Sequence, residues 1–403
     1  MLAPLIWLAL GAFAVGTEGF MIAPILPRIA DDLSITLVAA GQVVTIFALA
    51  YGLSSPILTA LTGRVARRPL LIGAMAAFAL ANLVAAAAPD YWSLVAARVL
   101  LAFSAGLYVP GANALAGAMV APEKRGRAIA VVNGGLTLAV TLGVPLGAVI
   151  GNALGWRMTF IAVAGLSAAA LIGLFFGLPE GVGAGMTSAG FRQRIAVAKQ
   201  PGMLASLLVT LLWAIGAYTV YTYVAPFMAH TVNIDGGAIG GILFLWGLSA
   251  AVGLAVGGAK ADRLGPDTVV GVALLLAVIA LASLSNWAHF LTPHQALVPV
   301  LVTVALWGMA HWGFWPAQQA RLIGIAGLPV APVALSLNAS FMYLGFSLGA
   351  GLGSLTMQHL SVADLGWAGA TSVLASLILF AAITRSRKTA SNASPLAECS
   401  AKA

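Results

Sequence analysis

Three ionisable side chains lie inside long apolar stretches of the chain: Glu18, Arg98 and His311. An ionised group at the centre of a bilayer costs roughly 3 kcal/mol or more, so each of these residues is a functional candidate. A carboxylate and an imidazole can bind and release protons, and a guanidinium can tune a neighbouring carboxylate. The chemistry that these residue types predict is therefore proton binding within a membrane.

Glu18 and Arg98 are expected to lie at similar depths. With a rise of about 1.5 Å per residue, Glu18 lies roughly 14 Å and Arg98 roughly 9 Å below the outer ends of their apolar stretches. The arginine favours the ionised carboxylate, whereas burial favours the neutral acid, and a proton coupler needs this balance to change as the site opens to alternate sides. The hypothesis is that Glu18 binds the coupled proton and Arg98 modulates it. The alternatives are a static buried pair, or an arginine that extends to the headgroups.

His311 lies in the stretch LWGMAHWGFWPAQQ and is the third proton-coupling candidate, because a free imidazole titrates near neutral pH. No acidic residue is apparent in the neighbouring apolar stretches. This favours the alternative interpretation, a neutral imidazole hydrogen-bonded in aromatic surroundings. In either case His311 can contact a ligand.

The composition identifies lipid as the solvent of this chain. Of its 403 residues, 61% are hydrophobic and only 7% are charged, whereas soluble domains carry about 25% charged residues. The apolar runs are continuous rather than alternating, which argues against a barrel of strands. The net charge of +8 is scattered in small groups between apolar runs, so it indicates membrane topology and not a nucleic-acid partner.

Hydropathy and turn residues predict an all-α membrane protein with twelve transmembrane helices in two pseudo-symmetric six-helix bundles. The bundles are expected at residues 1–179 and 202–385, with a Gly-rich cytoplasmic linker at 180–201 and a disordered cytoplasmic tail at 386–403. The expected helices span residues 4–27, 37–61, 69–88, 92–119, 127–153, 157–178, 203–228, 237–259, 268–287, 296–319, 330–357 and 366–384.

The basic residues predict the orientation. Only Arg28 and Arg157 fall in connections on one side of the membrane, and the connections and termini on the other side hold sixteen basic residues. By the positive-inside rule, both termini are cytoplasmic. The expected location is the bacterial inner membrane, with the first apolar run retained as a helix.

A repeated sequence motif relates the two halves. GLYVPGANALA at Gly106–Ala116 is echoed by WGFWPAQQARL at Trp312–Leu322, and alignment on the shared proline pairs the amides Asn113 and Gln319. A membrane segment with a polar stripe, used at corresponding places in both halves, is typical of a transporter built from repeats.

Polar and aromatic side chains in the apolar stretches are candidates for a central substrate cavity, because they suit an amphipathic organic ligand by stacking and hydrogen bonding. Any single one can equally be a contact between helices. The candidates are Asn113, Asn133, Thr137, Tyr218, Tyr221, Trp307, Gln319, Asn338 and Tyr343.

The fifth expected helix carries Gly143, Pro145 and Gly147, which predict a bend and a smooth face for a neighbouring helix. We expect this face to meet the eighth helix at Gly253 and Gly257. Such a seam would allow the two halves to slide, although small residues also serve ordinary helix packing.

Several passages resemble the major facilitator superfamily, and within it the twelve-helix drug/proton antiporter group. The passages are TALTGRVARRP at Thr59–Pro69, GAKADRLG at Gly258–Gly265, RVLLAFSAG at Arg98–Gly106, TLGVPLGAVIG at Thr141–Gly151 and GTEGFMIAPILPRIADDL at Gly16–Leu33.

The resemblance implies conformational roles for the basic loops. Arg64, Arg67 and Arg68 match the loop after the second helix, and Asp262 and Arg263 match its fuller copy in the second half. Glycine at position 63 replaces the acidic residue by which the family latches its two halves. The resemblance therefore implies a latch that relies on Asp262 or on backbone contacts.

The predicted function is proton-coupled efflux of a small organic solute, such as a drug, sugar or nucleoside, by alternating access. The alternatives are a proton-linked importer or uniporter, and a membrane sensor that keeps the fold without transport. The sequence carries no phosphate-binding loop, no metal-spaced histidine pair and no Ser-His-Asp grouping. We therefore expect no enzyme activity, no cofactor, no metal and no nucleic acid, and partners limited to substrate, protons and lipid around a monomer.

Overall fold

The computed structural model describes residues 2–121, 124–183 and 190–400, and these residues form helices and turns without strands. Twelve helical segments are long and apolar enough to cross a membrane, which confirms the predicted all-α fold. In the first half the helices are α1 (Leu2–Asp32), α2 (Leu37–Leu61), α3 (Arg67–Ala86), α4 (Tyr91–Ala118), α5 (Arg125–Leu138), α6 (Val144–Ala153) and α7 (Trp156–Gly177), with the π-helical turn η2 (Ala139–Gly143) joining α5 to α6.

The second half follows a short helix in the linker, α8 (Phe191–Ala198). Its helices are α9 (Met203–Tyr221), α10 (Val224–Val232), α11 (Ile239–Leu264), α12 (Pro266–Phe290), α13 (Pro293–Ala326), α14 (Ala331–His359) and α15 (Leu365–Ser400), with 3-10 turns η3 (Gly236–Ala238), η4 (Leu328–Val330) and η5 (Val362–Asp364). Helix α15 continues to Ser400, so residues 386–400 are helical where the sequence predicts disorder. Residues 401–403 of the expected tail lie outside the described residues.

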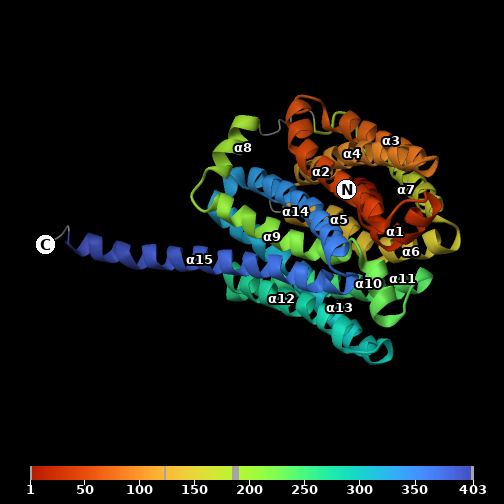
Figure 1. Ribbon diagram of the computed structural model, residues 1–403. Helices are drawn as coiled ribbons and strands as arrows, with labels where there is room; N and C mark the ends of the chain where they lie inside the picture. The colour runs from red at the N-terminus through yellow and green to blue at the C-terminus, as the bar shows by residue number, and fades with distance from the viewer. Residues whose placement is uncertain (1, 122–123, 184–189, 401–403) are drawn as a thin grey trace.

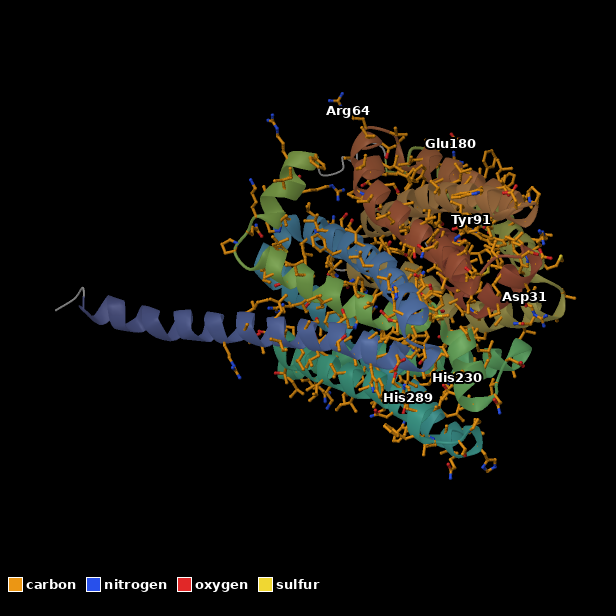
Figure 2. The ribbon with its side chains drawn as sticks, in the orientation of Figure 1. Asp31, Arg64, Tyr91, Glu180, His230 and His289 are labelled. Atoms are coloured by element: carbon orange, nitrogen blue, oxygen red, sulfur yellow. The ribbon has the colours of Figure 1, made fainter. Side chains whose placement is uncertain are left out.

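The two halves lie side by side in Figure 1, with the first half toward the upper right and most of the second half below it and to the left. Between the halves, α2 packs along α14, and α11 packs against η2 and α6. Arg64 and Asp31 mark opposite ends of the helices in Figure 2. We call the end that holds Arg64 and the linker helix α8 the basic end.

The corresponding helices α4 and α13 begin in the same way. The side chain of Asp90 accepts a hydrogen bond from the backbone N–H of Ser93 at 2.9 Å, and Thr292 and Gln295 form the equivalent capping box on α13. Such caps satisfy backbone donors that the first turn leaves open. The repeat seen in the sequence thus extends to the start of both helices.

Large apolar side chains cover the outer surface. Leu80, Phe176 and Val298 are 64%, 81% and 66% exposed. A water-facing surface would keep such residues scattered, whereas a lipid-facing one requires them.

Pro145 explains the π-helical turn η2. Proline has no backbone N–H, so it cannot donate to the carbonyl of Thr141 one turn earlier. The helix widens over Ala139–Gly143, and the hydroxyl of Thr141 donates to the carbonyl of Gly247 on α11 at 3.1 Å. The structure has a π-helical turn where the sequence predicts a bend, and this turn contacts the second half.

The glycines of this span do not face α11 as expected. A Cβ at Gly147 would lie 3.0 Å from Met21 Cβ on α1, and a Cβ at Gly253 or Gly257 would lie 2.7 Å from backbone atoms of α13. The expected seam is therefore wrong in its residues. The glycine of α11 that meets η2 is Gly247, six residues before Gly253. Residues six positions apart on a helix point in different directions, so Gly247 faces the fifth span while Gly253 faces α13.

A leucine at Gly247 is expected to push the halves apart. A Cβ there would lie 2.6 Å from Thr141 Cα, a backbone neighbour that cannot rotate away. In a Cys399→Ser background, spin labels at the exposed positions Leu80 and Ile279 should report a longer distance across the two halves. Gly241→Leu is the matched control on the same helix, because its Cβ meets nothing within 4 Å. An unchanged distance in Gly247→Leu would contradict the packing described above.

Candidate functional site

Glu18 on α1 and Arg98 on α4 form an ion pair in the first half. Nη1 of Arg98 donates to Oε1 of Glu18, and both side chains are fully buried. Complete burial of the guanidinium excludes the alternative in which Arg98 extends to the headgroups. The contact predicted from their similar depths is formed, and its role in proton coupling stays a prediction.

The pair is only partly satisfied by hydrogen bonds. Among the described residues, Oε2 of Glu18 and two nitrogens of Arg98 have no partner. The ring of Phe47 on α2 covers the guanidinium, with 4.0 Å between its carbon and the ring centroid. Buried ion pairs are stable when their remaining donors and acceptors are matched. Here one carboxylate oxygen stays open to a proton.

His311 on α13 does not join this pair. Its ring stacks on Trp213 of α9 at 4.2 Å between centroids and an interplanar angle of 14°. None of the ion pairs found among the described residues includes His311, and its Nδ1 has no hydrogen-bond partner there. The aromatic surroundings of the alternative interpretation are present, whereas the hydrogen bond that it expects is not found at Nδ1 among the described residues.

Aromatic rings join the two halves near the centre of the molecule. The ring of Phe20 on α1 contacts the rings of Tyr218 and Tyr221 on α9, with centroids 6.2 and 5.8 Å apart. The hydroxyl of Tyr221 donates to the carbonyl of Phe20 at 3.1 Å. Tyr51 on α2 stacks on Tyr343 of α14 at 3.7 Å. Three predicted cavity residues, Tyr218, Tyr221 and Tyr343, thus lie at the interface between the halves.

Trp307, a fourth predicted cavity residue, is buried on α13. Its ring centroid lies 5.5 Å from that of Trp246 on α11 and 6.4 Å from that of Tyr221. Trp213 and Trp246, which the sequence does not single out, therefore lie beside the predicted residues Trp307, His311 and Tyr221. Hydropathy did not separate these tryptophans from ordinary core residues.

Asn113, Asn133 and Thr137 form a separate polar group on α4 and α5. Nδ2 of Asn113 donates to Oδ1 of Asn133 at 3.2 Å, and the hydroxyl of Thr137 donates to the backbone carbonyl of Asn133 at 3.2 Å. These contacts also fit the alternative interpretation, in which such residues hold helices together.

Asn338 belongs to a buried network in the second half. Its Oδ1 accepts from the hydroxyl of Thr210 at 2.7 Å, and that hydroxyl accepts from Nε2 of Gln318 at 3.0 Å. Gln318 is fully buried, whereas the predicted Gln319 is only half-buried. Neighbouring residues on a helix point about 100° apart, and the sequence signal could not decide which of the two amides faces inward.

The basic end is held together differently from the family-like expectation. Asp262 and Arg263 are exposed, and neither belongs to an ion pair found among the described residues. The expected latch through Asp262 is therefore not formed. Exposed charges such as these, in the last turn of α11, interact weakly because water screens them.

Arg194 of the linker helix α8 bridges the two halves instead. It donates to the hydroxyl of Thr59 on α2 at 3.1 Å and to that of Ser336 on α14 at 2.7 Å. Burial lowers the pKa of its guanidinium. The sequence marked Arg194 only as one of the linker's charges.

Arg68 has a local role among the predicted conformational residues. Its guanidinium donates to the carbonyls of Phe175 and Leu178 at 2.7 and 2.9 Å, and so caps the end of α7. Arg67 is buried, and Arg64 is exposed at the basic end. Among the hydrogen bonds found between described residues, those of these three arginines are made by Arg68.

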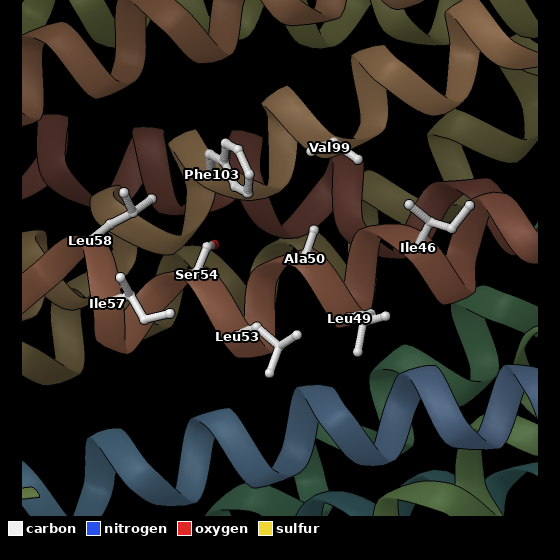
Figure 3. Close-up of a pocket in the computed structure, with 9 residues that line it drawn as sticks. All are labelled: Ile46, Leu49, Ala50, Leu53, Ser54, Ile57, Leu58, Val99 and Phe103. Carbon is white, nitrogen blue, oxygen red and sulfur yellow. The ribbon is translucent and has the colours of Figure 1, made fainter.

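An apolar groove lies between α2 and α4 (Figure 3). Its volume is about 450 Å³, and Ser54 is the one polar residue that lines it. Leu49, Leu53 and Ile57 in this lining are 42% to 50% exposed. The groove belongs to the outer apolar surface and holds no group that could carry the chemistry of the Glu18–Arg98 pair.

The sequence profile described as Major Facilitator Superfamily matches residues 8–225. The chain is 37% identical to an uncharacterized MFS-type transporter, YbcL, of Bacillus subtilis, over 93% of this chain and 94% of that protein. It is 35% identical to the inner membrane transport protein YdhP of Escherichia coli K12, over 88% of this chain and 89% of that protein. It is 31% identical to a chloramphenicol resistance protein of Streptomyces lividans, over 93% of this chain and 95% of that protein.

A solved structure shares the fold. The human organic anion transporter MFSD10 superposes with a TM-score of 0.70 at 18% sequence identity, covering 94% of this chain and 98% of that one. At this identity the likeness concerns the arrangement of helices alone.

Proposed function

The chain belongs to the major facilitator superfamily, and from this premise we propose that it exports a small organic solute in exchange for protons. It is a multi-pass bacterial membrane transporter and not an enzyme. The proposal adds an inner-membrane location with both termini cytoplasmic, since sixteen basic residues gather on one side. Its working unit is a monomer in lipid.

The Glu18–Arg98 ion pair carries the proposal of proton coupling. A fully buried carboxylate with one open oxygen can take up a proton and release the arginine. Water reaching the pair from one side of the membrane would favour the charged state, and closure would favour the neutral acid. The pair thus changes its protonation with the direction in which the protein is open.

The aromatic interface supports a substrate site between the halves. Tyr218, Tyr221 and Tyr343 contact rings that belong to both halves, so rocking one half against the other would change these contacts. Efflux is supported by the relative named for chloramphenicol resistance, which matches the chain over nearly its full length. We propose a neutral organic compound similar to chloramphenicol as the substrate.

Flux into proteoliposomes tests the proposal. With the protein reconstituted in both orientations and the lumen made acidic, radiolabelled chloramphenicol should accumulate at least about tenfold over protein-free vesicles, because protons leaving the lumen drive the solute in. Collapse of the gradient with an ionophore should abolish the accumulation. Accumulation only when the medium outside the vesicles is acidic would identify a proton-linked importer. Binding of the solute without flux would identify a sensor.

A further inference from the structure

Several indole N–H groups outside the centre of the second half donate hydrogen bonds to side chains of the protein. Nε1 of Trp156 donates to Asp32 at 3.1 Å, and Nε1 of Trp287 donates to Thr303 at 3.0 Å. A buried indole N–H usually finds such a partner, because leaving a donor unpaired in an apolar interior is unfavourable.

Four indoles at the centre of the second half depart from this rule. Their Nε1 atoms are buried and have no hydrogen-bond partner among the described residues, and Nδ1 of a histidine beside them is also unpartnered. We call this group the indole cluster; its members are Trp213, Trp246, Trp307, Trp312 and His311.

The indole cluster is contiguous. The ring centroid of His311 lies 4.2 Å from that of Trp213, 6.1 Å from that of Trp246 and 5.9 Å from that of Trp312. The centroids of Trp246 and Trp307 lie 5.5 Å apart. Helices α9, α11 and α13 therefore bring four unpaired donors to one place.

One member of the cluster, Trp312, lies at the interface between the halves. Trp312 is half-buried, although its Nε1 atom is covered, and its ring lies 6.4 Å from that of the half-buried Phe20 on α1. A solute between the halves meets these two rings before it meets the inner indoles.

The chemistry of the cluster selects among solutes. An indole nitrogen donates a hydrogen bond and cannot accept one, so four unpaired indoles call for acceptor atoms on the ligand. The surrounding ring faces favour a flat aromatic body. No Asp or Glu forms an ion pair with the cluster among the described residues, and Glu18 is held by Arg98. A permanent cation would find no counter-charge among these side chains.

We propose that the indole cluster binds uncharged aromatic solutes that carry several hydrogen-bond acceptors, such as nitro and carbonyl oxygens. This inference rests on the proposed transport function and names the class of its substrate. The ligand would supply hydrogen-bond acceptors to indole N–H groups that have none among the described residues of the protein.

Equilibrium binding to the purified full-length protein, with no gradient present, tests the site. Chloramphenicol, which has nitro, carbonyl and hydroxyl oxygens, should bind at least about tenfold more tightly than tetraphenylphosphonium, an aromatic cation without acceptors. Trp246→Phe and Trp307→Phe keep a ring and remove the N–H, so each should weaken chloramphenicol binding about fivefold to tenfold. Trp92→Phe, at a residue 74% exposed, is the matched control and should change nothing.

Two results would overturn the site: tighter binding of the cation, or no chloramphenicol binding by the unmodified protein. An equal loss for both probes in the phenylalanine variants would show that the rings and not the N–H groups matter, and would also overturn it. Trp312→Phe, at a half-buried position, repeats the test should an inner variant not fold. Selective binding of chloramphenicol without proton-driven flux would refute the proposed proton coupling and leave the binding site supported. Proton-driven flux of tetraphenylphosphonium alone would support the coupling and refute the binding site.

Discussion

Glu18→Gln is expected to reduce proton-driven accumulation of solute at least about tenfold, to near the level of empty vesicles. Glutamine matches the carboxylate in size and can still accept a hydrogen bond from Arg98, but it cannot take up a proton in the accessible range. Exchange of labelled for unlabelled solute without a gradient should persist, because it requires alternating access and no net proton movement.

The measurement is the ratio of gradient-driven accumulation to downhill exchange in the same vesicles, which corrects for any loss of folded protein. Glu180→Gln is the matched control, since Glu180 is exposed in the connection after α7. Full gradient-driven accumulation by Glu18→Gln would remove Glu18 from the mechanism and leave the ion pair as a static structural contact.

Arg98→Met is expected to lower the free energy of unfolding by about 3 to 5 kcal/mol, because it leaves the carboxylate of Glu18 buried without its counter-charge. The double variant Glu18→Gln/Arg98→Met removes both charges and should recover most of this loss. Both side chains are fully buried, so solvent screens neither charge.

Reversible unfolding of the four proteins of this double-mutant cycle in lipid and detergent mixtures measures the coupling between the two residues. Arg28→Met, at an exposed arginine, controls for the loss of a positive charge as such. Additive losses in the two single variants and the double variant would mean that the pair contributes no interaction energy, contrary to the buried geometry.

Much of the architecture could be predicted because lipid restricts the choices of the chain. A backbone in hydrocarbon must satisfy its own hydrogen bonds, so each continuous apolar run of sufficient length becomes a helix. All twelve predicted spans correspond to helices. The contact between Glu18 and Arg98 was predictable for a related reason: both are charged residues at similar depth, and burial in an apolar medium favours their pairing.

The direction in which each side chain points was not predictable in the same way. These helices are apolar nearly all round, so the period of the sequence does not distinguish the face toward lipid from the face toward the partner helix. Two results reflect this limit: the fully buried amide of α13 is Gln318, next to the half-buried Gln319, and the glycine that meets the fifth span is Gly247, whereas Gly253 packs on α13.

The sequence by itself determined that the chain is a twelve-helix membrane protein of two related halves, with one acidic residue inside the first predicted span, 4–27, and one arginine inside the fourth, 92–119. Hydropathy and charge depend on residue type and position along the helix axis, which the sequence states directly. Only the tertiary structure decided the rotation of each helix about that axis. That rotation brings Arg194 between the halves and gathers the unpaired indoles of Trp213, Trp246, Trp307 and Trp312 at one site.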